Sequence, residues 1–285
     1  MKVAFIADFF NSDLLGGAEL NDSVLLSHLE KEFQVTCISS KDIIIEELSR
    51  FDYLVISNFC MLDEESKSFI QNNSKYIIYE HDHKYVSTRD PSRFPNFEIP
   101  EKHILNREFY KKAYKVICLG QKQVEIIHKN LKINNLESIS GSLWSTAKLD
   151  FIKKLNNNKV KNNKFAIVDS SNPIKNTKMA IEFCKGKNIE YDLIKSPDPY
   201  EFIETLSRYN GLVFFPSVLE SMCRLAVEAK MVNCKLITIP KMLGAFYEPW
   251  FNLNGKELIS RVENNVKLAL DRFSQIISQC PNEPQ

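Results

Sequence analysis

The chain has 285 residues and a mass of 33.0 kDa, about twice an ordinary domain length, which predicts two domains. Hydrophobic residues make up 44% of the sequence and charged residues 26%, a balance too apolar for a disordered chain. The 37 Lys and Arg residues nearly equal the 36 Asp and Glu residues, so the net charge of +1 argues against a general nucleic-acid binder.

Seven cysteines are scattered along the chain without a C-x-x-C pair. This pattern is typical of reduced, buried thiols and predicts a cytoplasmic protein. The apolar run at the N-terminus is far shorter than a signal peptide or a membrane span, so we expect neither.

Short apolar runs alternate with helical patterns from the first residue onward. Leu25, Leu29 and Phe33 recur every four residues, which predicts a helix between the first two runs. The runs are mostly apolar on both faces, as buried parallel strands are. This alternation predicts a doubly wound α/β domain over residues 1–143. Its expected strands are 3–8, 34–39, 53–57, 76–80 and 116–119.

A second alternating series follows a polar, asparagine-rich stretch at 134–164, which predicts a linker and then an exposed connection. The second α/β domain is expected over residues 144–262. An amphipathic stretch at 257–277 ends the chain with no strand after it. The expected strands are 165–168, 191–194, 212–215 and 236–239, and the expected helices are 177–185, 200–208 and 222–231.

Ligands of an open parallel sheet bind beyond the carboxyl ends of its strands. Gly16 and Gly17 follow the first strand and open a helix, where the bare backbone can approach an anion. A plain tight turn is the alternative. The long connection 84–100 carries Arg89 and Arg93, and we expect it to bind an acceptor.

The fourth strand ends in Glu80-His81-Asp82-His83. No third ligand follows at a spacing that suits a metal, so we expect no metal here. Two interpretations stay open for the histidine: a ring hydrogen-bonded at the edge of the sheet, or a polar group directed into a cleft between domains.

Acidic and basic residues recur at helix starts in the second domain. Lys175 and Lys178 stand at the start of a helix, where their positive charges oppose the helix dipole. An anionic ligand would offset this cost, although solvated surface lysines are the alternative.

Glu220 precedes a helix and Glu228 lies eight residues later, about 12 Å along a helix. That span is roughly the reach of a nucleotide diphosphate, whose hydroxyls would meet both carboxylates while its phosphates face the helix N-terminus. A solvated acid on a surface helix is the alternative for Glu228.

These segments together resemble glycosyltransferase family 4, the retaining GT-B enzymes that use nucleotide-sugar donors. The resemblance covers most of the chain. It rests on Gly-Gly-Ala-Glu at 16–19, His-Asp at 81–82, the strand and glycine at 116–120, Lys-Asn at 175–176, Glu220-x7-Glu228, and Gly-Ala-Phe-Tyr-Glu at 244–248.

The resemblance implies two Rossmann-like doubly wound domains that face each other across a cleft. The acceptor-side domain would span 1–143 with a returning C-terminal helix at 263–285, and the nucleotide-sugar domain would span 144–262. Glu220 would contact the donor sugar, Glu228 the ribose, and Lys175 the diphosphate. The implied catalytic residues are His81, Asp82 and Glu220. The implied donor-binding residues are Gly16, Gly17, Ser170, Lys175, Lys178, Glu220, Ser221, Met222, Arg224, Glu228 and Gly244. The implied acceptor-binding residues are Glu19, His83, Arg89 and Arg93.

The implied reaction moves a sugar, with retention, from a UDP- or GDP-sugar to a hydroxyl of a glycan or other small acceptor. It needs no metal and no cofactor besides the nucleotide sugar. Catalysis would consist of positioning and of stabilising charge on the leaving phosphates. The sequence departs from the family where an Arg usually precedes the Lys by five residues, because Ser170 stands there, and Lys178 or Arg224 are the candidate substitutes.

Two other functions remain as alternatives. One is a non-catalytic protein of the same fold that binds a nucleotide sugar or a glycan. The other is a Rossmann oxidoreductase, which the lack of a G-x-G-x-x-G motif disfavours. The basic residues of 102–115 predict either a weak peripheral membrane contact or, more simply, a solvated helix, and no specific nucleic-acid partner.

Overall fold

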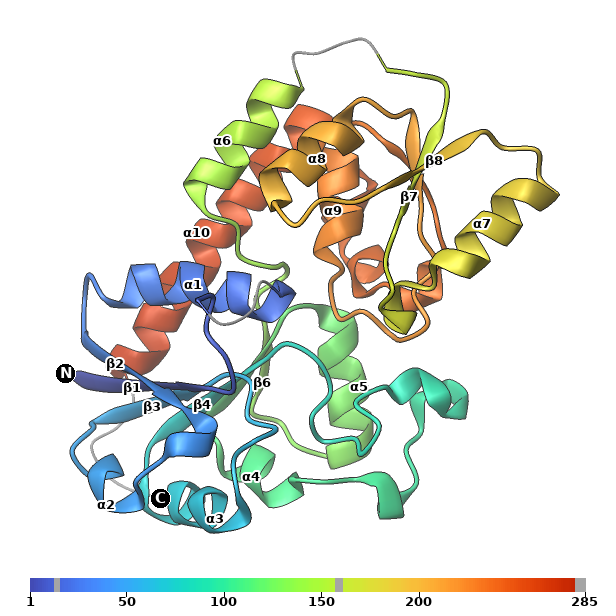
Figure 1. Ribbon diagram of the computed structural model, residues 1–285. Helices are drawn as coiled ribbons and strands as arrows, with labels where there is room; N and C mark the ends of the chain where they lie inside the picture. Colours follow the sequence, from blue (N-terminus) through green and yellow to red (C-terminus); the bar gives the residue numbers. More distant parts are fainter. Residues whose placement is uncertain (13–15, 157–160, 280–285) are drawn as a thin grey trace. The chain divides into compact units, whose positions relative to one another are not determined.

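A computed structural model describes residues 1–12, 16–156 and 161–279 of the chain (Figure 1). The chain divides into two compact units. Unit 1 comprises Met1–Leu143 and Asn265–Gln285, and unit 2 comprises Trp144–Asn264. The long last helix, α10 (Gly255–Gln279), therefore supplies residues to both units.

Unit 1 is built on a six-stranded parallel sheet with the strand order β2-β1-β3-β4-β5-β6. Every residue of β3 and β4 is buried, which explains the continuous apolar runs of these two strands. The strands are β1 (Lys2–Ala7), β2 (Gln34–Ser39), β3 (Tyr53–Ile56), β4 (Tyr76–Glu80), β5 (Lys115–Cys118) and β6 (Leu136–Ser138). The helices are α1 (Gly17–Leu29), α2 (Ile45–Leu48), α3 (Glu64–Asn73), α4 (Arg107–Lys112) and α5 (Gln121–Leu131).

The C-terminal part of α10 packs onto unit 1. The ring of Phe273 lies 4.9 Å from that of Tyr79 on β4, and Ser274 is hydrogen-bonded to His28 of α1 at 2.9 Å. Arg272 donates to Glu137 of β6. The expected return of the last helix to the first α/β unit is confirmed.

Unit 2 has a four-stranded parallel sheet with the order β10-β9-β7-β8. The fold class is therefore as expected, with two parallel α/β units. The strands are β7 (Phe165–Val168), β8 (Tyr191–Ile194), β9 (Gly211–Val213) and β10 (Lys235–Ile237). The helices are α6 (Thr146–Leu155), α7 (Thr177–Gly186), α8 (Pro199–Ser207) and α9 (Arg224–Met231). A core of Ile167, Ala180, Cys184, Val213 and Phe215 joins α7 to the sheet.

The prediction of a linker at 134–164 was wrong for most of that stretch, which contains β6 and α6. The three residues of β6 are only half-buried, so the strand has no apolar run to reveal it. Helix α6 starts at a Ser145 cap, which accepts from the backbone N–H of Lys148, and it buries Leu149 and Ile152. The asparagines that follow this short amphipathic pattern favoured the prediction of a linker instead of a helix.

The connection 84–100 is also more ordered than expected. It contains two 3₁₀ turns, Pro91–Arg93 and Pro95–Phe97, and Val86 forms an antiparallel bridge with Ile104. Asn130 of α5 holds it by accepting from the N–H of Ile99 and donating to the carbonyl of Phe97. The remaining 3₁₀ helices are Ser40–Asp42, Glu101–His103, Pro173–Lys175, Pro240–Met242, Gly244–Tyr247 and Pro249–Asn252.

Within the described ranges, no helix combines the length and the apolar character needed to cross a membrane.

Candidate functional site

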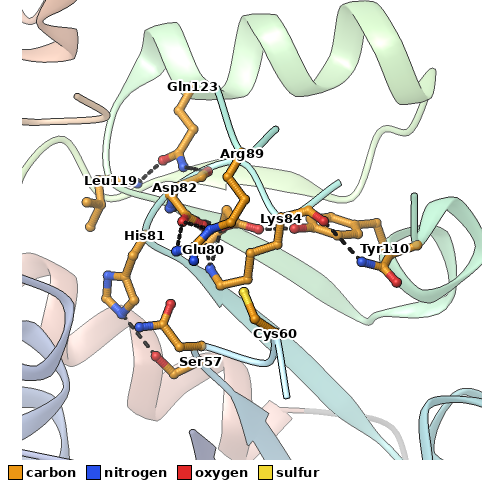
Figure 2. Close-up of polar contacts among 12 residues, drawn as sticks. Ser57, Cys60, Glu80, His81, Asp82, Lys84, Arg89, Tyr110, Leu119 and Gln123 are labelled. Atoms are coloured by element: carbon orange, nitrogen blue, oxygen red, sulfur yellow. Dashed lines mark hydrogen bonds and ion pairs between the residues drawn. The ribbon is translucent and has the colours of Figure 1, made fainter. Parts of the chain in front are cut away.

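Three buried polar side chains meet where strands β3 and β4 of unit 1 end, and Figure 2 shows two of them, His81 and Ser57. His81 follows β4, Ser57 follows β3, and Asp22 belongs to α1. The Nε2 atom of His81 lies 2.8 Å from Oδ1 of Asp22 and 3.0 Å from Oγ of Ser57. Ser57 donates to the other oxygen of Asp22 at 2.6 Å. A carboxylate only accepts hydrogen bonds, so Nε2 of His81 carries a proton, and in the neutral ring Nδ1 then keeps its lone pair.

The trio of Asp22, Ser57 and His81 contains the residue types of a serine hydrolase but not its geometry. In such a triad, the carboxylate and the serine bind opposite nitrogens of the histidine ring. Here Asp22 and Ser57 both contact Nε2, and the hydroxyl of Ser57 donates its hydrogen bond to Asp22. The other ring nitrogen, Nδ1, is buried and has no hydrogen-bond partner among the residues that the structure describes. A hydrogen-bond acceptor left in this state is costly unless a polar group reaches it.

Asp82 lies in a network of charged side chains beside this trio, of which Glu80 and Lys84 are buried (Figure 2). Its Oδ1 accepts from Nζ of Lys84 at 2.8 Å, and its Oδ2 accepts from Nε of Arg89 at 2.7 Å. Lys84 also donates to Glu80 at 2.7 Å, and Tyr110 donates to the same carboxylate. Burial opposes ionisation of Asp82, but the charges of Lys84 and Arg89 outweigh it and lower the pKa of Asp82. Asp82 is therefore a fixed anion and not a base.

The backbone of this segment is clamped from α5. The amide of Gln123 donates to the carbonyl of Asp82 at 2.6 Å and accepts from the N–H of Leu119 at 2.9 Å. Figure 2 shows this amide joining the two chain segments. Because β4 and β5 end side by side, one buried glutamine fixes the position of Asp82 relative to both.

The residues expected to bind an acceptor lie in different surroundings. Arg89 and Arg93 are largely exposed, and Arg93 pairs with Asp90 at 3.6 Å. Glu19 is buried on α1 and accepts from Asn58 at 3.4 Å. A Cβ atom at position 16 would meet the carboxylate of Glu19, so a larger residue there would require the Glu19 side chain to shift. Gly17 is the first residue of α1.

His83 is fully buried, and within the described part of the chain neither of its ring nitrogens has a hydrogen-bond partner. Its ring packs edge-on against Tyr85 at 5.7 Å. Burial lowers the pKa of His83 to about 4, because the charged form is poorly solvated there. The ring is therefore neutral at physiological pH and faces no solvent in this structure.

His83 should make the stability of the protein depend on pH. Between pH 6.5 and about 4 the unfolded chain binds a proton that the folded chain does not, so stability falls as the pH falls. We expect the free energy of unfolding to lose about 2 kcal/mol from pH 6.5 to 5 through this residue, at about 1.4 kcal/mol per pKa unit. Urea unfolding at both pH values should show this loss shrinking in His83→Met and persisting in a His103→Met control. An equal loss in both variants would contradict the assignment.

In unit 2, Glu220 is held by two neighbouring loops. Its N–H donates to the carbonyl of Met242 at 3.0 Å, and its carbonyl accepts from the N–H of Gly244 at 2.8 Å. Nζ of Lys175 lies 3.0 Å from its Oε1. Burial disfavours the charge on Lys175, but Glu220 outweighs this effect and raises the pKa of the lysine, which stays a cation. A Cβ atom on Gly244 would lie 1.8 Å from the carbonyl oxygen of Ser221, so only glycine fits this loop.

Ser221, Met222 and Cys223 form a buried turn between Glu220 and α9. The hydroxyl of Ser221 is buried and has no hydrogen-bond partner in residues 1–12, 16–156 and 161–279. Cys223 has a φ of 65°, in the left-handed region, so α9 begins only at Arg224, two residues later than predicted. No side chain caps the first turn of α9.

Glu228 lies one turn into α9 and is held by the first residue of unit 2. Nε1 of Trp144 donates to its Oε1 at 2.8 Å. Arg224, four residues before it on the helix, lies 3.8 Å from the same oxygen and stacks over the Trp144 ring at 4.6 Å. Glu220 and Glu228 thus flank the start of α9, each beside a cation.

Ser170 lies in the β7–α7 connection, and Lys178 is the second residue of α7. Ser170 shapes that turn, because its Oγ accepts from the N–H of Asn172 at 3.1 Å and its carbonyl accepts from Thr177 at 3.2 Å. Lys178 is 89% exposed and pairs with Glu182 at 3.9 Å.

Over the described part of the chain, no three His, Cys, Asp or Glu side chains are grouped as a metal site requires.

Solved structures match the chain over nearly its whole length. A sucrose-phosphate synthase from Thermosynechococcus elongatus has a TM-score of 0.60 at 11% identity, with 98% of each chain covered. AviGT4, a glycosyltransferase involved in avilamycin A biosynthesis, has a TM-score of 0.57 at 9% identity, with 98% of this chain and 97% of that chain covered. The chain has the GT-B fold.

The GT-B fold is shared by enzymes of more than one reaction type. A UDP-N-acetylglucosamine 2-epimerase from Rickettsia bellii also matches, with a TM-score of 0.57 at 9% identity, covering 98% of this chain and 96% of that chain. No protein-family model matches the sequence, and no curated protein is detectably similar to it.

Several residues of the candidate site had no signal in the sequence. Asp22 and Ser57 are separated from His81 by 59 and 24 residues, and Trp144 is 84 residues from Glu228. Asp22 lies one turn after Glu19 on α1, and Trp144 is one of two tryptophans, but neither feature indicates a partner. Only the fold brings these residues together.

Proposed function

We propose that the protein is a retaining glycosyltransferase of family 4. It would transfer a sugar from a UDP- or GDP-sugar to a hydroxyl of a glycan or other small acceptor, without a metal. The observation that carries the proposal is the arrangement around α9, where Glu220 pairs with Lys175 and Glu228 is fixed by Trp144. GT-B neighbours named as a synthase and a glycosyltransferase support the reaction class, and the epimerase supports a UDP-sugar donor.

Unit 2 supplies the donor-binding groups in this proposal. Glu220 accepts hydrogen bonds from the hydroxyls of the sugar, and Glu228 accepts them from the ribose. Lys175 and the uncapped start of α9 face the diphosphate, because a cation and free backbone N–H groups both favour an anion. The Glu220–Lys175 pair holds each partner in place before the donor arrives, which reduces the ordering cost of binding.

Unit 1 supplies the acceptor side. Nδ1 of His81 accepts a hydrogen bond from a hydroxyl of the transferring sugar and so fixes its orientation. Asp82 contributes a fixed negative charge, since both of its oxygens are already paired with cations. With no base at that position, the acceptor gives its proton to the leaving diphosphate as the bond from C1 to the diphosphate breaks and the bond from C1 to the acceptor oxygen forms on the same face.

The experiment that tests this function measures binding and products together. Calorimetric titration with UDP, GDP, ADP and their sugars should find a donor, and chromatography of the products should then find a glycosylated acceptor with the anomeric configuration retained. Binding without turnover would support the non-catalytic alternative, and a change at C2 of the sugar would support an epimerase. Failure to bind any of these nucleotides would overturn the proposal.

Replacing Glu228 with Gln should weaken donor binding by about 10- to 100-fold. A hydrogen bond to a charged acceptor contributes about 1.5–3 kcal/mol, and the amide loses that charge while keeping the size of the side chain. The dissociation constant from titration calorimetry is the measurement. Glu204→Gln, which alters an exposed carboxylate of α8 in the same unit, is the matched control. Unchanged affinity for every donor in Glu228→Gln would remove the ribose role.

A further inference from the structure

Given the proposed function, on which this inference rests, we propose that the acceptor is an uncharged hydroxyl compound that carries an alkyl chain. The chain lies along three exposed apolar side chains of unit 1, those of Met61, Phe9 and Ile44. These side chains stand at the same edge of the sheet as His81, and they are not used by the donor.

Each of the three side chains belongs to the loop that follows a different strand of the unit 1 sheet. Phe9 follows β1 and is 37% exposed, Ile44 follows β2 and is 55% exposed, and Met61 follows β3 and is 45% exposed. Strand β1 lies between β2 and β3, so the three loops are neighbours at the carboxyl edge of a parallel sheet. Ligands of such sheets bind at this edge.

The buried carboxylate of Asp8, at the end of β1, ties the three loops together. It accepts from the N–H of Cys60 at 2.8 Å, from the N–H of Met61 at 2.9 Å, and from the hydroxyl of Ser40. Ser40 begins the loop after β2, and Phe9 is the residue directly after Asp8. The apolar side chains are therefore held on loops that one carboxylate fixes relative to one another.

The same loops adjoin the residues on the acceptor side of the proposed reaction. Strand β4, which ends just before the proposed catalytic histidine, pairs with β3 on the side away from β1. Burial raises the pKa of the Cys60 thiol, and the nearby charges of Arg89 and Asp82 act on this pKa in opposite directions. Cys60 therefore lies close to the network around Asp82, as Figure 2 also shows, and it directly precedes Met61.

The strand order places the reacting group and the apolar side chains in a row. Strands β4, β3, β1 and β2 are consecutive neighbours in the sheet. Adjacent strands lie about 4.8 Å apart, so the row from His81 to the loop after β2 spans roughly 14 Å. A row of this length suits an extended alkyl chain better than a single aromatic ring.

The two strands on the other side of β4 present a different surface. Strands β5 and β6 are followed by apolar residues that are buried, Leu119 at 4% exposure and Ile139 at 8%. The exposed Met1 and Tyr114 directly precede β1 and β5, so they stand at the opposite edge of the sheet. Single exposed hydrophobic residues are ordinary, whereas several gathered at one ligand-binding edge indicate a partner.

The charges beside the row favour an acceptor whose polar end is uncharged. Lys84 pairs with both Glu80 and Asp82, and Arg89 pairs with Asp82. The formal charges of these two cations and two carboxylates cancel. This network therefore offers no surplus charge to a phosphate or carboxylate on the acceptor, whereas a hydroxyl group needs none.

The test uses alkyl glucosides with methyl, hexyl and decyl chains, each below its micelle concentration as established by light scattering. Burial of one CH₂ group changes affinity about fourfold, and a chain on an open surface is buried only in part. We expect the dissociation constant from calorimetric titration to fall about 100-fold from the methyl to the decyl compound. With a donor present, the decyl glucoside should also be the best acceptor of the three.

Substitutions along the row should act in the order of the strands. Met61→Gln and Phe9→Gln should each weaken binding of the decyl compound about tenfold and leave binding of the methyl compound unchanged. Ile44→Gln, farthest from β4, should weaken the decyl compound and spare the hexyl compound. Leu268→Gln, at a position of α10 that is 58% exposed, is the matched control and should change nothing. Circular dichroism melting checks that each variant is folded.

The outcomes separate this inference from the function on which it rests. Transfer to a chain-free acceptor without any dependence on chain length overturns the alkyl acceptor and keeps the transferase. Binding that depends on chain length and on Met61, in a protein that binds no nucleotide sugar, supports the alkyl-binding surface and overturns the transferase.

Other occupants of the same surface give other results. A wild-type dimer that Met61→Gln dissociates would assign the surface to a second copy of the chain. Binding to phosphatidylcholine vesicles that requires Met61, with no binding of single glucoside molecules, would assign it to a membrane. An equal loss in Leu268→Gln and Met61→Gln would indicate unspecific adsorption. Each of these three results overturns the inference.

Discussion

Replacing Lys84 with Met is expected to lower the free energy of unfolding by about 3–5 kcal/mol. Lys84 is 1% exposed, and it neutralises both the fully buried Glu80 and the partly buried Asp82. Methionine preserves the length of the side chain but leaves two carboxylates in a poorly solvated environment without their cation. Removal of one partner from a buried ion pair costs this much because an uncompensated charge remains. Denaturant unfolding monitored by circular dichroism measures the loss.

Two controls isolate the buried charge as the cause. Lys129→Met removes a surface pair of the same 2.8 Å length, formed with Glu98, and should change stability little. The double variant Glu80→Gln with Lys84→Met removes both charges and should recover much of the loss, although Asp82 keeps only Arg89 as a partner. If Lys84→Met were as stable as Lys129→Met, the buried network would not be a determinant of stability.

The same network also determines what Asp82 can do chemically. Burial raises the pKa of Glu80, although Lys84 opposes this, whereas the cations around Asp82 lower the pKa of Asp82. Two carboxylates two residues apart thus have pKa values shifted in opposite directions because their surroundings differ. Asp82 offers a constant negative electrostatic potential over the working pH range. Transfer should therefore show no pH dependence that arises from titration of Asp82 near neutrality.

The elements that were predictable from the sequence are those with a strong local pattern. Strands β3 and β4 are completely buried, so both of their faces are apolar. Consecutive hydrophobic residues in the sequence therefore reveal these strands. Strand β6 has half-buried residues on the edge of the sheet, so its place depends on pairing with β5 and not on composition. Helix α9 was placed two residues early because an apolar pattern does not reveal the left-handed φ of Cys223.

The residues of the candidate site likewise differ in whether a local sequence pattern could reveal them. Glu220 and Lys175 could be chosen because their residue types stand at loop and helix starts, where a parallel sheet binds ligands. Their direct pairing at 3.0 Å, across 45 residues of sequence, could not be inferred from either segment. Trp144 lies in a stretch that the sequence pattern marked as linker, and only the packing of α9 shows that it orients Glu228.

Replacing His81 with Ala is expected to lower kcat for sugar transfer by about 10²- to 10³-fold while weakening donor binding much less. In the proposed reaction, Nδ1 orients the transferring sugar, and such positioning is worth about 10²-fold or more in rate. Most of the donor affinity would come from Glu220, Glu228 and Lys175 in unit 2. Steady-state kinetics and titration calorimetry on the same sample provide the two numbers. Equal losses in transfer and binding would contradict this placement of His81.

The neighbouring carboxylate supplies a sharper form of the same test. Asp22→Asn keeps the size of the side chain but offers an amide that can donate to Nε2, so the proton can move to Nδ1, the atom that must accept from the sugar. We expect kcat to fall about as far as in His81→Ala, with the fold intact. Ser57→Ala removes a hydroxyl from the same trio and leaves Asp22 to hold the tautomer, so it should retain most of the activity. A fully active Asp22→Asn protein would contradict the role given to Asp22 in holding the proton of His81 on Nε2.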